Sequence, residues 1–158
     1  MILSALYADR LTTLPGVAEA ADPRLRLLHC RLERGPSAMS RVSVALAGPD
    51  DAPPVVCRQE GTACPGGDLR LAALATLAAL AQVAGGTCAF ELIGVKPVRA
   101  FDATVIMVAA FATRDGVVTR IVGAAVVDGD PLIATARAAC HAANRLAIPL
   151  VEAPSADA

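Results

Sequence analysis

Two stretches of the chain resemble each other and decide how it is expected to fold: residues 55–63 read VVCRQEGTA, and residues 117–125 read VVTRIVGAA. Aligned without a gap at an offset of 62 residues, five of the nine positions are identical. The same offset matches Gly67-Asp68 with Gly129-Asp130, and an Ala-rich run of helical length follows each Asp. We therefore interpret the chain as an internal duplication in which each copy closes with a strand, a loop and a helix.

Alternation of apolar and polar residues predicts three strands ahead of each helix. In the first copy they are expected from residue 25 to a break at 35–36, at 41–47 and at 55–60; in the second copy, at 88–95, 103–112 and 117–125. Val42, Val44 and Leu46 share one face of their strand, and residues 104, 106 and 108 match them at the same offset. We expect Pro97 to end a strand and Asp115-Gly116 to form a tight hairpin turn.

The two helices are predicted at 68–84 and 130–146. Asp68 and Asp130 are interpreted as helix caps, because a carboxylate accepts the free N–H groups of a first helical turn. Pro131 suits the first helical position, where its missing N–H costs least. The first helix is apolar nearly all round, which predicts that it is covered on more than one side. A second subunit is one candidate source of part of that cover.

These elements predict an α+β fold: two tandem βββα units related by a pseudo-twofold, with antiparallel sheets packed against Ala-rich helices. The expected division is an N-terminal arm or linker at 1–23, a first unit at 24–86, a second unit at 87–150 and a flexible tail at 151–158.

Composition argues against several function classes. A net charge of −1 and an aromatic content of 3% do not fit a nucleic-acid-binding surface. No apolar stretch reaches the roughly 20 residues of a membrane span, and the N-terminus lacks the basic region of a signal peptide, so we expect a cytoplasmic protein. The five cysteines form no CxxC pair, so we expect neither a metal site nor a cofactor.

Short motifs in a fixed order carry a resemblance to a known family. They are Gly61-Thr62-Ala63 with Gly67-Asp68-Leu69, Gly123-Ala124-Ala125 with Gly129-Asp130, Ala134-Thr135-Ala136-Arg137-Ala138, and Ala143-Asn144-Arg145-Leu146. With two βββα units, this pattern resembles the regulatory (allosteric, dimerisation) domain of 2-isopropylmalate synthase, an enzyme of leucine biosynthesis, and of its relative citramalate synthase. The resemblance covers roughly residues 25–147.

The resemblance implies a homodimer that binds an amino-acid end product, leucine in the parent enzyme, near the dimer interface. Carried over, the ligand-binding candidates are Gly61, Thr62, Ala63, Asp68, Gly123, Ala124, Ala125 and Asp130. Small residues let a ligand approach the backbone, and a helix N-terminus attracts a carboxylate. The sequence departs from the family pattern where Ala63 and Ala125 replace the second glycine of each loop, and it holds no catalytic barrel, so we expect no condensation chemistry within it.

Three hypotheses about function follow. The first is a non-catalytic module that binds an amino acid or small carboxylate, dimerises and regulates a catalytic partner protein. The second is an assembly module that oligomerises without a ligand, which a sealed backbone beside Gly61 and Gly123 would favour. The third and least favoured is a small enzyme that uses Cys64, His29 or His141.

The repeated arginines Arg58 and Arg120 have two interpretations. Each is either a solvated position on the face of a sheet or a contact for an anion.

Overall fold

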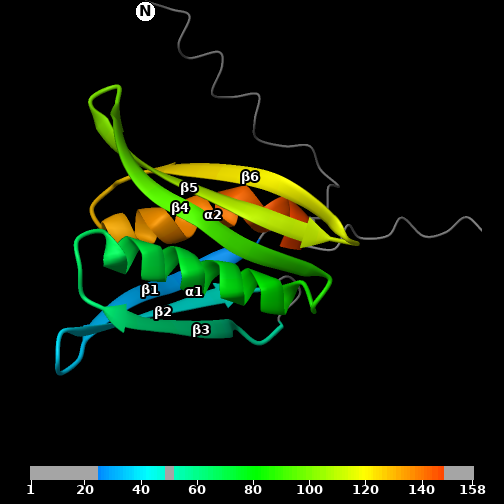
Figure 1. The fold of residues 1–158 in the computed structure, drawn as a ribbon, viewed down its shortest axis with the longest axis horizontal. Helices are drawn as coiled ribbons and strands as arrows, with labels where there is room; N and C mark the ends of the chain where they lie inside the picture. Colours follow the sequence, from blue (N-terminus) through cyan, green and yellow to red (C-terminus); the bar gives the residue numbers. More distant parts are fainter. Residues whose placement is uncertain (1–24, 49–51, 148–158) are drawn as a thin grey trace, which may run out of the picture.

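The computed structural model describes residues 25–48 and 52–147 (Figure 1). The predicted N-terminal arm at 1–23, residues 49–51 and the predicted tail at 151–158 lie outside the described residues. The elements follow one another as β1 (Arg26–Arg34), β2 (Met39–Ala47), β3 (Val55–Thr62), α1 (Gly67–Val83), β4 (Cys88–Ala100), β5 (Ala103–Arg114), β6 (Val117–Val126) and α2 (Pro131–Ala147).

The strands form two antiparallel sheets of three strands each, ordered β1-β2-β3 and β4-β5-β6. A helix follows each sheet in the sequence. The predicted α+β fold of two βββα units is therefore confirmed.

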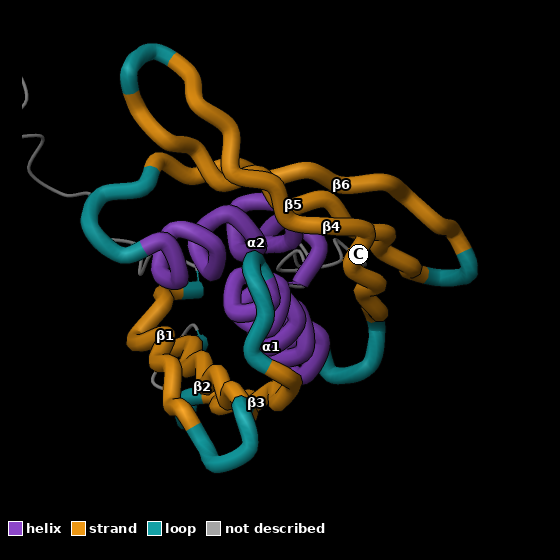
Figure 2. The backbone as a smooth tube through the Cα atoms, turned by 60° about the vertical axis from the view of Figure 1, so that its left-hand side comes forward, coloured by secondary structure: helices purple, strands orange, loops and turns teal. Residues whose placement is uncertain are grey.

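Both helices lie between the two sheets, so the chain forms three layers (Figure 2). Helix α1 packs on β2 and β3 of its own sheet, on α2 beside it and on β4 of the opposite sheet. Most of its apolar circumference is thus covered within one chain.

Small side chains allow the helix layer to pack closely. Ala72, Ala75 and Ala79 of α1 are fully buried, as are Ala136 and Ala139 of α2. Alanine gives up almost no side-chain conformational entropy on burial and lets neighbouring backbones approach, so an Ala-rich core compensates for the scarcity of aromatic residues.

The predicted inner face of the second strand is confirmed, since Val42, Val44 and Leu46 are fully buried. The prediction that a strand ends near Pro97 is wrong, because β4 continues to Ala100 and Pro97 pairs with Ile106. β4 lies at the edge of its sheet, where a residue without an N–H is tolerated.

The hairpin turn at Asp115-Gly116 is confirmed. Both residues have positive φ, 52° and 76°, as a tight two-residue hairpin requires. The corresponding connection in the first unit, 48–54, is longer. The 62-residue offset therefore does not hold for the middle strands: Val42 pairs with Gln59, yet Ile121 pairs with Ala110 and not with residue 104.

The helices are also offset differently from the sequence repeat. They begin at Gly67 and Pro131 and end at Val83 and Ala147, so their offset is 64 residues rather than 62. Asp130 precedes α2 and caps it, with the N–H of Leu132 donating to its carboxylate at 2.8 Å. The cap predicted for Asp68 is wrong, because Gly66 occupies the capping position of α1 and Asp68 already lies in the first turn.

Candidate functional site

The predicted site residues of the first unit lie at the C-terminal end of β3 and the start of α1. Gly61 and Thr62 are the last residues of that strand and pair with Ser40 and Met39 of β2. The N–H of Ala63 donates to the carbonyl oxygen of Ala38 at 2.6 Å, which extends the pairing by one step. This segment is therefore a strand end and its continuation, held by backbone hydrogen bonds.

The small size of Gly61 serves helix packing. A Cβ atom built on Gly61 would lie 3.3 Å from Cδ2 of Leu71 on α1. The space that a ligand would need beside this backbone is occupied by the helix of the same unit.

The predicted residues of the second unit lie within a strand and not in a loop. Gly123, Ala124 and Ala125 belong to β6 and pair with residues 108, 107 and 106 of β5. A Cβ atom on Gly123 would lie 2.9 Å from Cα of Ala142, and closer still to the carbonyl oxygen of Ala138. The backbone of α2 therefore seals this glycine completely.

The structure separates the strand residues of the two sets. Gly61 and Thr62 lie in the sheet β1–β3, and Gly123 to Ala125 lie in the sheet β4–β6, on opposite sides of the helix layer (Figure 2). Gly61 and Gly123 therefore do not share one ligand site within a chain.

A hollow of about 310 Å³ opens beside the first set, at the end of the β1–β2 hairpin. It is lined by Glu33, Arg34, Gly35, Pro36, Met39, Ser40, Arg41 and Glu60. This hollow was not predicted from the sequence. The available signal was that Glu33, Arg41 and Glu60 occupy the same side of three neighbouring strands. Only knowledge of the pairing register reveals that these charges meet.

Ion pairs join the charged groups of the hollow. Nε of Arg41 lies 2.5 Å from Oε1 of Glu60, and a second guanidinium nitrogen lies 3.9 Å from Glu33. Arg34 donates to the hydroxyl of Ser40, which is buried, and its other nitrogen lies 2.7 Å from the carboxylate of Asp68. Asp68 thus ties the start of α1 to the end of β1.

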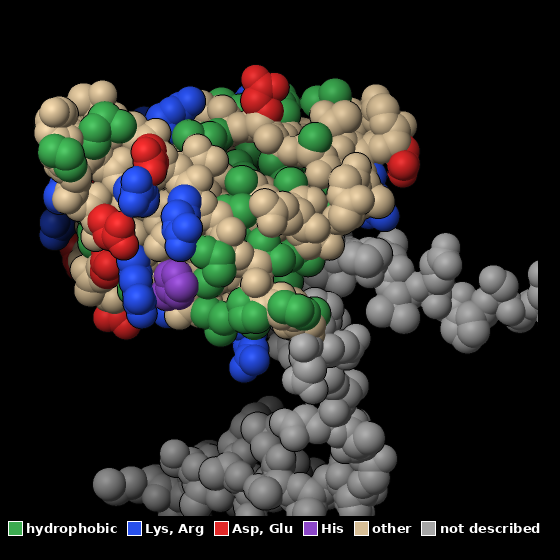
Figure 3. Space-filling model, turned by 90° about the horizontal axis from the view of Figure 1, so that it is seen from below, with side chains coloured by type: hydrophobic (Ala, Val, Ile, Leu, Met, Phe, Trp, Pro, Cys, Tyr) green, Lys and Arg blue, Asp and Glu red, His purple; other side chains and the backbone are tan. Residues whose placement is uncertain are grey.

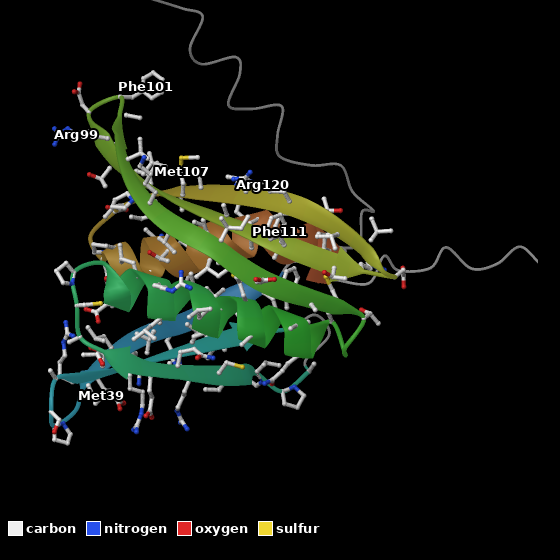
Figure 4. All side chains as sticks on the ribbon, in the orientation of Figure 1. Met39, Arg99, Phe101, Met107, Phe111 and Arg120 are labelled. Carbon is white, nitrogen blue, oxygen red and sulfur yellow. The ribbon has the colours of Figure 1, made fainter. Side chains whose placement is uncertain are left out.

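The repeated arginines lie on the outer faces of the two sheets. Arg58 shares its face with Arg41, Glu60 and His29, and Figure 3 shows acidic and basic side chains interleaved there with a histidine. Arg120 extends from the outer face of the other sheet, as Figure 4 shows. Both arginines are exposed, which agrees with a solvated position on a sheet.

The candidate nucleophiles and bases are scattered. Burial raises the pKa of the Cys30 and Cys140 thiols to about 12, and it also raises the pKa values of Cys57 and Cys88. Cys64 is the exposed cysteine. Nδ1 of His141 lies 3.2 Å from both the nitrogen and the oxygen of Ala124, so it contacts the free edge of β6.

Within residues 25–48 and 52–147, no three His, Cys, Asp or Glu side chains converge in a way that would hold a metal ion. In the same ranges neither helix is long and apolar enough to cross a membrane. A scan against protein-family models finds no match to this chain, and neither does a search of curated proteins.

Proposed function

We propose that this chain is a non-catalytic association module, a regulatory-type domain whose role is to bind another folded protein surface. The observation that carries the proposal is the contrast between the outer faces of its two sheets. One is mainly charged and suited to water, and the other is mainly apolar, with a few charged side chains on its edge strands, and lacks a cover within the described residues.

The apolar face is the outer side of the sheet β4–β6. It is formed by Val98, Val105, Met107, Phe111, Val118, Val122 and Val126, which point away from the helix layer. Valines at positions 118, 122 and 126 are each more than half exposed. A contiguous apolar sheet face of this kind marks an interaction surface, because single exposed apolar residues are common but clustered ones are not.

The charged face, on the outer side of β1–β3, provides an internal comparison. Arg31, Glu33, Arg41, Arg58 and Glu60 lie there on neighbouring strands. Two faces of the same architecture thus differ in polarity, which supports association through one sheet and exposure of the other to solvent. The helices lie between the two sheets (Figure 2), so the association is assigned to the sheet.

A pair of matched substitutions tests this proposal. Val122 is 52% exposed on the apolar face and Val56 is 46% exposed on the charged face, and both lie on edge strands. We expect Val122→Asp to weaken association strongly and Val56→Asp to leave it unchanged, as measured by light scattering during gel filtration. Equal effects of the two variants would contradict the proposal.

A second candidate function, binding of an amino acid or small carboxylate, is favoured by the hollow beside Gly61 and Thr62. Its guanidinium groups suit a ligand carboxylate, and the carboxylates of Glu33 and Glu60 suit a ligand ammonium group. These groups are already paired with one another, so a ligand would have to exchange those ion pairs for its own. This second candidate would retain the regulatory role that the family resemblance implies, acting on a catalytic partner protein.

Thermal denaturation with leucine, other branched-chain amino acids and 2-keto acids tests the second candidate. A ligand at ~100 times its Kd stabilises by ~2.7 kcal/mol. A rise in melting temperature that is lost in Arg41→Met but retained in Arg58→Met would support a site in the hollow. No rise with any member of the panel would leave association as the function.

A further inference from the structure

We infer that the surface covering the apolar face is the same face of a second copy of this chain, packed about a twofold axis that runs along β5. This inference rests on the proposed association function and adds the partner and its orientation. Charged side chains on the two edge strands of the apolar face indicate this partner.

One row of side chains crosses the face from edge to edge. Glu91 on β4 pairs with Phe111 on β5, and Phe111 pairs with Arg120 on β6. The acidic and basic side chains are therefore separated by two strand spacings, about 10 Å, with an aromatic ring between them. Neither Glu91 nor Arg120 forms an ion pair with another described residue.

A twofold axis along the central strand β5 places the row of Glu91, Phe111 and Arg120 against the same row of a second copy, with opposite charges facing each other. It places β4 of one copy over β6 of the other, so Glu91 meets Arg120 of the second copy twice, once on each side. Phe111 then meets its own counterpart on the axis. In the isologous contact of a twofold dimer, each residue pairing occurs twice.

A twofold axis across the strands is the competing arrangement. It places β4 over β4 and brings Glu91 near Lys96 of the second copy, while Arg120 faces an alanine. The axis along β5 is preferred because a guanidinium pairs with a carboxylate through two parallel hydrogen bonds and is weakly hydrated. Lys96, with its long stem on an edge strand, reaches water from the rim of the dimer.

The size of the face sets the expected strength of the dimer. Three strands and about ten residues give a face of about 14 Å by 33 Å. That projected area is roughly half of the 800 Å² or so that each partner contributes to a standard interface. We therefore expect a dimer that dissociates at micromolar concentrations.

Charge-reversal variants distinguish the twofold axis along β5 from the axis across the strands. Arg120→Glu and Lys96→Glu change the net charge equally, and both positions are exposed on edge strands of the same sheet. We expect Arg120→Glu to raise the dimer Kd by at least about tenfold, because like charges then meet twice, and Lys96→Glu to change it by less than about threefold. Sedimentation velocity over a concentration series gives each Kd, and circular dichroism confirms that each variant is folded.

The double variant Glu91→Arg with Arg120→Glu completes the test. Reversing both partners restores opposite charges across the twofold, so its Kd is expected to return to within about threefold of the wild-type value. Loss of dimerisation in Lys96→Glu, with none in Arg120→Glu, would overturn the axis along β5 while association stands. A wild-type chain that stays monomeric would overturn a second copy as the partner of the apolar face and would leave a different protein as its partner.

Discussion

Gly123 on β6 packs directly against the backbone of Ala142 on α2, leaving no room for a side chain. A Cβ atom at position 123 would lie 2.9 Å from Cα of Ala142. The close approach fixes the distance between the second sheet and its helix. The glycine that the sequence repeat singles out is therefore a packing residue in this structure.

The first prediction concerns this contact. Gly123→Ala forces β6 and α2 apart, and because the opposing atoms are backbone, we expect it to lower the free energy of unfolding by about 3 kcal/mol or more. Gly35→Ala is the control, since a Cβ atom there would make only ordinary contacts, the nearest at 3.6 Å. Urea denaturation measures both. A change below about 1 kcal/mol in Gly123→Ala would contradict the assigned packing.

The secondary structure was largely predictable, whereas the relation between the two units was not. Local alternation predicted the strands, and a residue such as Val44 is buried because it has apolar neighbours at period two. Asp68 and Asp130 match in the sequence repeat but occupy different positions relative to their helices. The 62-residue offset assumes connections of equal length in the two units, and the connections differ in length. The hollow at Arg34 and Arg41 depends on strand register, which no single stretch of sequence specifies.

The two aspartates give the second prediction. Asp130→Ala removes the side chain that accepts from Leu132 N–H, and we expect a loss of ~1 kcal/mol of stability that is insensitive to salt. Asp68→Ala removes a partly exposed ion pair with Arg34, so its smaller cost should shrink further in high salt. Chemical denaturation at low and high salt distinguishes the loss of a helix cap from the loss of an ion pair. Identical, salt-independent losses would indicate that both residues act as caps.

A third prediction concerns alkaline pH. Burial raises the pKa of the Cys30 and Cys140 thiols from 9.0 to about 12, so the folded chain holds these protons more tightly than the unfolded chain does. Below about pH 9 the two protonated thiols contribute fully to the free energy of unfolding. As the pH rises towards about 12, the thiols of the unfolded chain ionise first, and this contribution is lost.

Urea denaturation at a series of pH values measures this loss. Cys30→Ala should flatten the decline of stability with pH, because one of the two protons no longer contributes. Cys64→Ser, at the exposed cysteine, should leave the slope as it is. An unchanged slope in Cys30→Ala would contradict the predicted linkage.

The turn between β4 and β5 gives the fourth prediction. Phe101 and Asp102 both have positive φ, 51° and 61°. Gly, Asn and Asp are the residues that visit this conformation, so the strain falls on Phe101. The Phe101 side chain is fully exposed, and Figure 4 places it at the tip of the hairpin. Replacing the pair by Asn-Gly should therefore stabilise the monomer by about 1 kcal/mol.

Asp115→Asn is the control for the hairpin, because the Asp115-Gly116 turn already has a favoured sequence. Thermal denaturation at a concentration below the dimer Kd compares the variants. A lower melting temperature for the Asn-Gly variant would show that Phe101 contributes contacts that outweigh its backbone strain.

The most direct measurement for the account as a whole is sedimentation equilibrium of the wild-type chain across a concentration range spanning the micromolar region. We expect an average mass that rises from the monomer value of 16.0 kDa towards twice that value as concentration increases. Val122→Asp should remain at the monomer mass throughout. A wild-type mass of 16.0 kDa at every concentration would contradict self-association through the apolar face.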